Sequence, residues 1–470
     1  MNYISTRGAA PRLGFEDVLL TGLARDGGLY VPEAWPSLPA DAPAALAGLS
    51  YADLTARVLE PFAGPTLGPA VLGDLTRKAY APFHHAAVAP LGQIDRNLWL
   101  LELFHGPTLA FKDYALQLLG GLFDHVLAKR GERLTIVGAT SGDTGSAAIE
   151  AVRGRDNIDI FMLHPHGRVS DVQRRQMTTV DAANVFNIAI DGTFDDCQDI
   201  VKALFGDLGF RDRVHLSAVN SINFARIAGQ IAYYVAAATA LGGGTGRPVT
   251  FAVPTGNFGN VFAAHVARAM GLPVGRLIIG SNANDILHRF FKSGAMETRA
   301  VVPTLSPSMD IQISSNFERL LFDLLDRDGA ALTQVMADFR AAGTFAVSPA
   351  QHDRATTLFA SHRLDDAGTL AEIARVHGDT GRLIDPHTAV AVAAARALGD
   401  PAAGPVVALA SAHPAKFPDA VKQATGVHPD LPPWLADLHE RPEHATPLPA
   451  DAGAVRTFIL AHAALTRSAA

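Results

Sequence analysis

Short apolar runs, rich in β-branched residues, alternate along this chain with stretches of helical periodicity. The runs are RLTIVGA (133–139), DIFMLHP (159–165), VFNIAI (185–190), VTFAVP (249–254), RLIIGS (276–281) and PVVALAS (405–411). Helical patterns between them include 144–154, 224–241 and 259–271. Buried apolar strands that alternate with helices are typical of a parallel sheet covered by helices on both faces. The sequence therefore predicts an α/β fold built on parallel twisted sheets.

The texture of the sequence divides the chain into four segments. Residues 1–92 are rich in Pro and Gly and contain short helical patterns, so we expect an N-terminal α-rich domain there. Two α/β domains are expected at 93–240 and 241–425, the second with an insertion around 300–380. Residues 426–470 are rich in Pro and Ala, and we expect this C-terminal extension to wrap the surface.

The charge and cysteine content exclude several classes of function. Lys and Arg total 39 against 46 Asp and Glu, a net charge of −7 without a basic run, so nucleic acid is not expected as a partner. Cys197 is the one cysteine, which excludes an intrachain disulfide and a cysteine-based metal site. With no HExxH pattern either, no metal site is predicted.

The sequence also gives expectations about location. The N-terminus lacks the basic-then-apolar pattern of a signal peptide. No apolar run reaches the length of about 20 residues that spans a bilayer. We therefore expect a cytoplasmic protein with no membrane partner.

VPTGNFGNVFAAHVARA (253–269) is the first of three segments that could bind an anion. An apolar run stops, a Gly/Asn segment turns, and a helix begins. Gly256 and Gly259 permit close approach of the backbone, and unpaired N–H groups at the helix start favour a phosphate. The alternative is a tight turn whose asparagines cap the helix.

IVGATSGDTGSAAIEAV (136–152) has the same layout, but hydroxyl groups dominate it. Thr140, Ser141, Thr144 and Ser146 surround two glycines, one of them Gly142. Hydroxyls with backbone amides suit a carboxylate, and the patterns of a P-loop or a dinucleotide-binding loop are absent. Asp143 in this loop either caps the helix or contacts the ligand.

AVNSINFARIAGQIAYY (218–234) opens a helix with several polar residues close together. Asn220, Ser221, Asn223 and Arg226 fall within one to two turns. The planar guanidinium of Arg226 could bind a phosphate. The alternative is helix capping by Asn220 or Ser221 together with a surface arginine.

HGPTLAFKDYALQLLG (105–120) places Lys112 in an apolar neighbourhood, between Phe111 and Asp113. Loss of solvation lowers the pKa of a lysine from about 10.4, and the neutral amine forms a Schiff base with a carbonyl. The alternative is a helix-edge lysine whose ammonium reaches water. One such lysine, a phosphate-type loop and a carboxylate-type loop are the parts that a pyridoxal phosphate enzyme needs.

These segments occur in a fixed order with others along nearly the whole chain. The set is STRG (5–8), DGGLYVPE (26–33), ELFHGPTLAFKD (102–113), ATSGDTGSAA (139–148), NSINFARIAGQ (220–230), PTGNFGN (254–260), SPSMDIQISSNFERL (306–320) and SAHPAKF (411–417). It resembles the threonine synthase family, in the longer form found in bacteria and fungi. That family lies within the fold-type II pyridoxal phosphate enzymes, the class of the tryptophan synthase β-subunit. Residues 1–92 would be its N-terminal domain.

The resemblance implies which residues hold the cofactor, pyridoxal 5′-phosphate. Lys112 would form the Schiff base, from the first α/β domain. Ser411, where relatives often have Thr, would meet the pyridine nitrogen. Asp143 would lie at the cofactor, where many fold-type II relatives have an asparagine at the 3′-oxygen. The phosphate would be held, from the second α/β domain, by Gly256, Asn257, Phe258, Gly259 and Asn260.

The resemblance also implies which residues hold the substrate. Its α-carboxylate would bind the loop formed by Thr140, Ser141, Gly142 and Thr144. Its phosphate would be gripped by Asn220, Ser221 and Arg226. The sequence assigns no role to the segment 306–320 or to three residues near the site by motif, His105, His413 and Lys416.

The implied reaction converts O-phospho-L-homoserine and water to L-threonine and phosphate by γ-elimination and β-addition, the last step of threonine biosynthesis. Such an enzyme is a pyridoxal phosphate-dependent carbon–oxygen lyase acting on phosphates. Two alternatives stay open: a phospho-lyase that releases 2-oxobutyrate from the same substrate, and a non-catalytic protein that binds the cofactor. The expected partner is a small molecule, and the expected state is a monomer or a homodimer.

Overall fold

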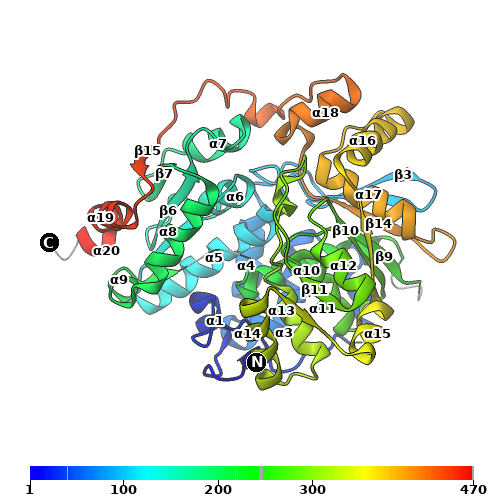
Figure 1. The fold of residues 1–470 in the computed structure, drawn as a ribbon, viewed down its shortest axis with the longest axis horizontal. Helices are drawn as coiled ribbons and strands as arrows, with labels where there is room; N and C mark the ends of the chain where they lie inside the picture. Colours follow the sequence, from blue (N-terminus) through cyan, green and yellow to red (C-terminus); the bar gives the residue numbers. More distant parts are fainter. Residues whose placement is uncertain (40, 218, 220, 243–246, 468–470) are drawn as a thin grey trace.

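The computed structural model of the chain describes residues 1–39, 41–217, 219, 221–242 and 247–467. Two sheets lie in two lobes, and helices cover both of them (Figure 1). Two further sheets consist of one antiparallel pair of short strands each: β1 (Tyr3–Ser5) with β2 (Tyr30–Pro32), and β11 (Ala295–Glu297) with β12 (Thr344–Ala346). This is the α/β architecture that the alternating pattern predicted.

The larger sheet has six strands in the order β13–β10–β9–β14–β4–β3. Their bounds are β3 Leu91–Asp95, β4 Leu98–Glu102, β9 Val249–Pro254, β10 Val274–Ser281, β13 Phe359–Arg363 and β14 Val406–Ala410. β3 pairs with β4 antiparallel, and the other pairs are parallel. The apolar runs predicted as strands at 249–254, 276–281 and 405–411 are confirmed here.

The smaller sheet has five parallel strands in the order β15–β7–β6–β5–β8. Their bounds are β5 Leu134–Ala139, β6 Ile158–Pro165, β7 Val185–Asp191, β8 Leu216–Ser217 and β15 Thr446–Pro449. Every residue of β6 is buried, as expected for a central strand that is apolar on both faces. The remaining predicted runs, at 133–139, 159–165 and 185–190, are confirmed in this sheet.

The helices pack on these sheets and on one another. Their bounds are α1 Phe15–Thr21, α2 Ala42–Leu46, α3 Tyr51–Leu67, α4 Pro69–Tyr80, α5 Lys112–Arg130, α6 Asp143–Val152, α7 Asp171–Thr178, α8 Phe194–Gly206, α9 Leu208–Arg213, α10 Phe224–Ala240, α11 Gly259–Ala269, α12 Ile286–Ser293, α13 Phe317–Leu324, α14 Gly329–Ala342, α15 Pro349–Leu358, α16 Asp366–Thr380, α17 Pro386–Leu398, α18 Pro418–Thr425, α19 Ala452–His462 and α20 Ala464–Arg467. Short 3₁₀ helices are η2 Pro307–Met309, η3 Pro414–Lys416 and η4 Pro433–Leu435.

Helices α5 and α10 pack against each other in the interior and are buried over most of their lengths. Helices that are apolar on most sides belong in a core. The close contact of α5 with α6 requires a glycine, because a Cβ on Gly120 would lie 2.1 Å from the carbonyl oxygen of Ala151. The start of α5, which carries Lys112, is therefore fixed by the packing of this helix against its neighbours.

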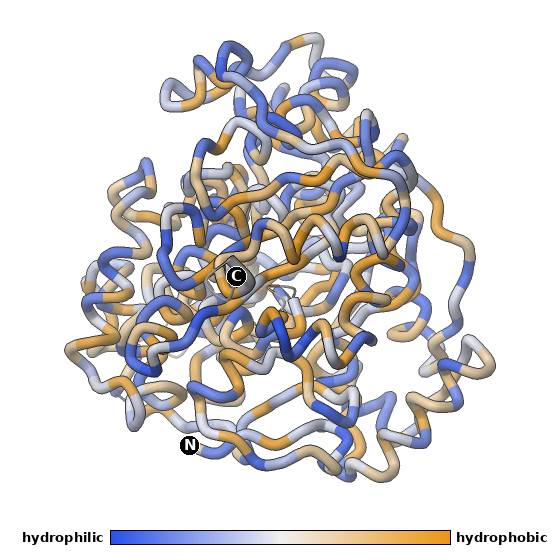
Figure 2. Tube along the Cα trace, turned by 90° about the vertical axis from the view of Figure 1, so that its left-hand side faces the viewer, coloured by the Kyte–Doolittle hydropathy of each residue, from blue (hydrophilic) through white to orange (hydrophobic). Residues whose placement is uncertain are grey.

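Hydrophilic stretches are most frequent along the outer loops of the trace (Figure 2).

The C-terminal extension does more than wrap the surface, so that expectation is wrong for its second half. β15 pairs parallel with β7, and α19 packs on α8 with Val455 and Ile459 buried. In Figure 1 the chain passes from α18 across the molecule to β15 in the other lobe. The strand TPLP (446–449) escaped notice because two of its four residues are proline, which is tolerated at a sheet edge.

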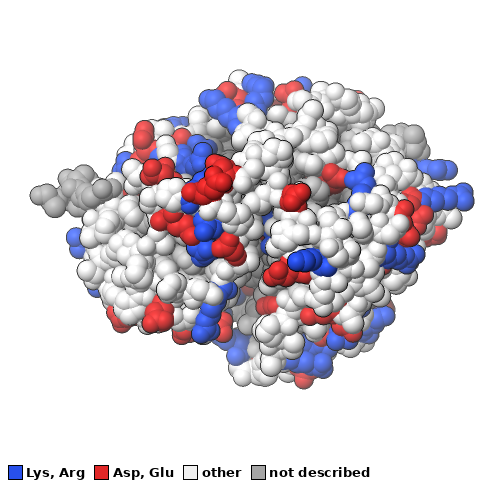
Figure 3. Space-filling view, turned by 90° about the horizontal axis from the view of Figure 1, so that it is seen from above, with Lys and Arg blue, Asp and Glu red and all other residues white. Residues whose placement is uncertain are grey.

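The larger sheet takes strands both from 91–102 and from residues after 249, and the division of the chain into four segments stays a prediction. No helix in the described part of the chain is both long enough and apolar enough to cross a membrane. On the face shown in Figure 3, basic and acidic side chains are interspersed.

Candidate active site

Three loops meet where the strands of the two sheets end. β14 leads into Ser411, and the carbonyl oxygen of Ser411 accepts a hydrogen bond of 2.8 Å from the backbone N–H of Phe111. Ala110 and Ala412 also pair as an antiparallel bridge. Lys112 begins helix α5 directly after these contacts. The backbone thus places Ser411 beside Lys112, although the two residues are 299 positions apart in the sequence.

Lys112 is a desolvated amine rather than a surface lysine. Its side chain is 11% exposed, and its Nζ lies 3.4 Å from Oδ2 of Asp143. Burial lowers the pKa of Lys112; the charge of Asp143 works against this shift, and those of Lys416 and Arg226 add to it. The neutral amine is the nucleophilic form of a lysine, so the group is suited to attack a carbonyl.

Asp143 carries a buried carboxylate that contacts side chains from several segments of the site. It is the first residue of α6, and its carboxylate lies 2.8 Å from Nζ of Lys416. Gln173 donates a hydrogen bond of 2.8 Å to it, and Ser308 donates one of 3.2 Å. Burial favours a higher pKa for Asp143, but the charges of Lys416 and Lys112 hold its pKa well below the ordinary value. Asp143 is therefore an ion-pair partner and not a helix cap.

The loop before α6 is shaped by one of its own hydroxyls. Thr140 is buried, and its Oγ1 accepts hydrogen bonds of 3.0 and 2.9 Å from the backbone N–H groups of Gly142 and Gly145. Ser141 is exposed and Thr144 is half-buried. The loop thus holds its turn through Thr140 and presents Ser141 and Thr144 outward. Binding of a carboxylate by this loop stays a prediction.

The turn between β9 and α11 has the form of an anion site. Phe258 adopts φ +63° immediately before α11, and no side chain in the described part of the chain caps this helix. The alternative in which asparagines cap the helix is therefore wrong. Uncapped N–H groups at a helix start attract a negative charge.

The segment 306–320, to which the sequence assigned no role, supports this turn. Ser314 donates a hydrogen bond of 2.7 Å to the carbonyl oxygen of Gly256, and the N–H of Asn316 donates one of 3.1 Å to that of Asn257. Because Ser308 in the same segment bonds to Asp143, the segment connects the turn to the lysine cluster.

Three buried donors, one in α10, one in α11 and one just before α13, have no partner in the described structure. They are Nε of Arg226, Nδ2 of Asn260 and Nδ2 of Asn316. Arg226 is 4% exposed and donates from Nη1 to the carbonyl oxygen of Val219 at 3.0 Å. Burial lowers the pKa of Arg226 to about 10. Buried unpaired donors are costly, and a bound anion would satisfy them.

Helix α10 is capped by a residue that neither interpretation of the sequence chose. Asn223 is the cap, since its side chain accepts a hydrogen bond from the N–H of Ala225. Capping by Ser221 with a surface arginine is wrong, because Ser221 is half-buried outside the helix and Arg226 is buried. Asn220 lies outside the described residues.

A buried histidine and aspartate that sequence reasoning missed stand behind Ser308. The N–H of Ser308 donates to Nε2 of His387 at 3.2 Å, so the ring hydrogen is on Nδ1, which donates to Oδ2 of Asp385 at 2.7 Å. Asp385 also caps α17, so the sequence signal DPHT (385–388) resembled an ordinary helix start. No sequence signal marked Gln173.

A cavity of about 200 Å³ lies at the ends of β4 and β14. Of the two histidines expected near the site, His413 lines this cavity and His105 bonds to Glu102 in its lining. Burial lowers the pKa of His413 to about 4, so its ring is neutral at pH 7. His105 bonds to Glu102 at 2.9 Å, and Glu102 also pairs with Arg382 at 2.8 Å. The polar groups of this cavity are thus largely satisfied by one another.

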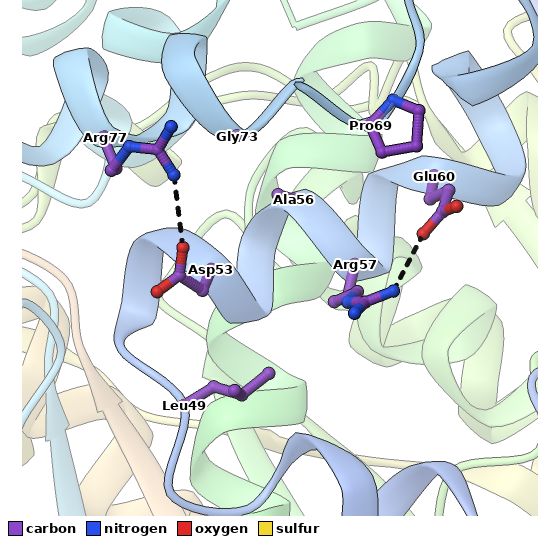
Figure 4. A pocket seen from close by; sticks show the side chains of 8 residues that line it. All are labelled: Leu49, Asp53, Ala56, Arg57, Glu60, Pro69, Gly73 and Arg77. Carbon is purple, nitrogen blue, oxygen red and sulfur yellow. Dashed lines mark ion pairs between the residues drawn. The ribbon is translucent and has the colours of Figure 1, made fainter. Parts of the chain in front are cut away.

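A larger hollow of about 350 Å³ lies between α3 and α4 and is lined by none of the candidate site residues (Figure 4). Its charged side chains are paired with each other, Arg77 with Asp53 at 3.5 Å and Arg57 with Glu60 at 3.6 Å. Pairs of exposed charges at these distances leave no strong site for a ligand. Within the described residues, no three His, Cys, Asp or Glu side chains are placed to hold a metal ion.

Comparison with known proteins decides the family. Residues 2–80 match the model for the threonine synthase N terminus, residues 83–344 that for pyridoxal-phosphate dependent enzymes, and residues 388–459 that for the threonine synthase C-terminal region. A threonine synthase from Pseudomonas aeruginosa is 55% identical over 463 residues, which cover 98% of each chain. The chain belongs to the threonine synthase family. It is a pyridoxal phosphate-dependent enzyme of fold-type II.

Solved structures of threonine synthases agree over the whole length. A PLP-bound threonine synthase from Brucella melitensis superposes with a TM-score of 0.96 at 53% identity, covering 99% of this chain and 100% of that one. The threonine synthase from yeast gives a TM-score of 0.93 at 38% identity, covering 98% of both chains. The resemblance seen in the sequence motifs is thereby confirmed.

The described residues fit the family's cofactor. An aldehyde needs a neutral amine, and Lys112 is a buried lysine of lowered pKa. A phosphate needs unpaired donors, and within the described residues the start of α11, which has no side-chain cap, and Nδ2 of Asn260, which has no partner, supply them.

Substitution of Gly142 tests how closely the loop before α6 packs against Gln173. Its φ is +147°, and a Cβ would lie 2.5 Å from Cδ of Gln173. Gly154 also has a positive φ, +69°, but open space around it. We expect Gly142→Ala to lower the free energy of unfolding by about 1–3 kcal/mol more than Gly154→Ala, because Gln173 must move away from Asp143. Urea unfolding measures both; equal losses would contradict the close packing.

Proposed function

We propose that the chain converts O-phospho-L-homoserine and water to L-threonine and phosphate, the last step of threonine biosynthesis. The observation that carries this proposal is Arg226, a buried guanidinium whose Nε has no partner among the described residues and whose charge acts on Lys112. The buried guanidinium of Arg226 needs an anionic partner, and the phosphate of the substrate is such an anion. Membership of the threonine synthase family supports the same substrate.

We propose the following cofactor contacts from the placement of the residues. Lys112 would bind the aldehyde carbon, and the turn from Gly256 to Asn260 would hold the phosphate. Ser411, beside Lys112, would offer its hydroxyl group to the pyridine nitrogen. Asp143, next to the amine, would contact the 3′-oxygen. When bound, the cofactor withdraws electrons from the substrate and so acidifies its Cα–H bond.

We propose that two further groups of residues orient the substrate. The loop with Thr140, Ser141, Gly142 and Thr144 faces the α-carboxylate at the start of α6, where a negative charge is favoured. Arg226, with Ser221 and Asn220, holds the phosphate. Gripping both ends of a short molecule fixes its Cα, Cβ and Cγ against one amine.

Lys112 is then the group that moves protons. Its amine is freed when the amino group of the substrate takes its place on the aldehyde carbon, and it then removes a proton from Cα. Loss of a Cβ proton releases phosphate from Cγ, a proton returns to Cγ, water adds its hydroxyl group at Cβ, and a proton returns to Cα. An amine of lowered pKa suits this sequence because it both accepts and donates protons near neutral pH. Burial of Lys112 limits the access of water to earlier steps.

Product analysis tests this function. The chain loaded with pyridoxal phosphate and incubated with O-phospho-L-homoserine is expected to release L-threonine and phosphate in equal amounts, measured by amino-acid analysis and a phosphate assay. Release of 2-oxobutyrate and ammonia with phosphate would support the phospho-lyase alternative instead. Absence of turnover in a chain that binds the cofactor would support a non-catalytic protein.

Arg226→Gln separates the two phosphate sites. The substitution keeps a donor for the carbonyl of Val219 but removes the charge, so we expect the KM for O-phospho-L-homoserine to rise about tenfold to a hundredfold. The Kd of pyridoxal phosphate is expected to change by less than about threefold. Arg226→Lys, which retains the charge, should recover part of the KM. Equal weakening of substrate and cofactor binding would contradict this role.

A cytoplasmic location and a monomeric or homodimeric state stay predictions.

A further inference from the structure

Two lysines share one buried carboxylate in this site. Lys416 is fully buried, and its Nζ lies 2.8 Å from Oδ1 of Asp143 and 2.8 Å from the carbonyl oxygen of Thr108. Lys112 reaches only Oδ2 of Asp143, at 3.4 Å. Charge-assisted hydrogen bonds are strongest near 2.7–2.9 Å, so Lys416 is the better bonded of the two cations.

Among the described residues, Lys112 has no ion-pair partner other than Asp143. Arg226 from α10 is a further positive charge near Lys112. The carboxylate of Asp113, next to Lys112 on α5, bonds to the N–H and hydroxyl group of Thr108, and its charge interacts with that of Lys416. The imidazole of His387, from α17, bonds to Oδ2 of Asp385 and accepts from the N–H of Ser308. A surplus charge in a buried site is most easily removed from the group with the weakest partners, which is Lys112.

We propose that Lys416 is a positioning residue that occupies the carboxylate of Asp143, so that the amine of Lys112 is free to lose its proton. Without Lys416, Asp143 would turn its full charge to Lys112 and hold it as an ammonium. Lys416 itself is fully buried and bonds to Asp143 and to the carbonyl oxygen of Thr108. The SAHPAKF segment thus serves the site twice, through Ser411 beside Lys112 and through Lys416 behind Asp143.

This inference rests on the proposed role of Lys112, but its test reads the amine directly and not turnover. The full-length chain freed of pyridoxal phosphate is treated with trace acetic anhydride at a series of pH values, and the labelled fraction of the Lys112 peptide is measured by mass spectrometry. Only the neutral amine reacts, so the midpoint of the labelling curve gives the pKa of Lys112.

Lys416→Met is expected to raise this midpoint by at least one pH unit, which reduces labelling of Lys112 at pH 7.5 about tenfold. Lys416→Arg keeps the cation and is expected to keep the midpoint within half a unit of the unsubstituted chain. Lys422→Met, an exposed lysine on α18, is the matched control and should leave the midpoint unchanged.

Asp143→Asn provides the opposite test. Removal of the carboxylate leaves Lys112 facing Lys416 and Arg226, so the midpoint is expected to fall, and in the double variant with Lys416→Met it should return toward the unsubstituted value. If Lys416→Met does not fold, the double variant, which removes both members of the buried pair, is compared with Asp143→Asn: a higher midpoint in the double variant supports the proposal, and equal midpoints overturn it. An unchanged midpoint in folded Lys416→Met, or a rise in Asp143→Asn, would overturn the proposal.

Discussion

The carboxylate of Asp143 receives hydrogen bonds or ion pairs from four segments that lie far apart in the sequence. Lys112 at the start of α5, Gln173 in α7, Ser308 in η2 and Lys416 in η3 all converge on it. A buried charge is tolerated only when it is paired and hydrogen-bonded, so each partner is held in place by the same requirement. The positions of these four segments therefore depend on one another.

The two sheets explain why such distant segments meet. Carboxyl ends of parallel strands gather at one edge, so β4, β9 and β14 in one sheet and β5 in the other deliver their loops to a common region. The turn after β9 supplies an uncapped helix start, and the segment 306–320 ties that turn to Asp143. A buried amine and a helix start without a side-chain cap among the described residues are brought near each other by the topology of the backbone.

Local pattern predicted most of the fold because each apolar run carries its own signal. β15 was missed because its proline-rich sequence forms a strand only when β7 offers an edge. Asp143 and Arg226 could be chosen from the sequence because polar residues are dense around them, and Lys112 because it is a lone cation in an apolar segment. The partners Gln173, His387 and Asp385 could not, because they contact the site through tertiary packing. Lys416 was marked by its motif, but its bond to Asp143 depends on the fold.

The proposed chemistry depends on a bond between the amine of Lys112 and the cofactor's aldehyde carbon. Reduction of the pyridoxal phosphate-loaded chain with sodium borohydride, followed by peptide mapping, detects this bond because the reduction makes it permanent. The pyridoxyl group is expected on the peptide that carries Lys112. A pyridoxyl group on Lys416 or on any other lysine, or a reduced chain that releases its cofactor on denaturation, would contradict it.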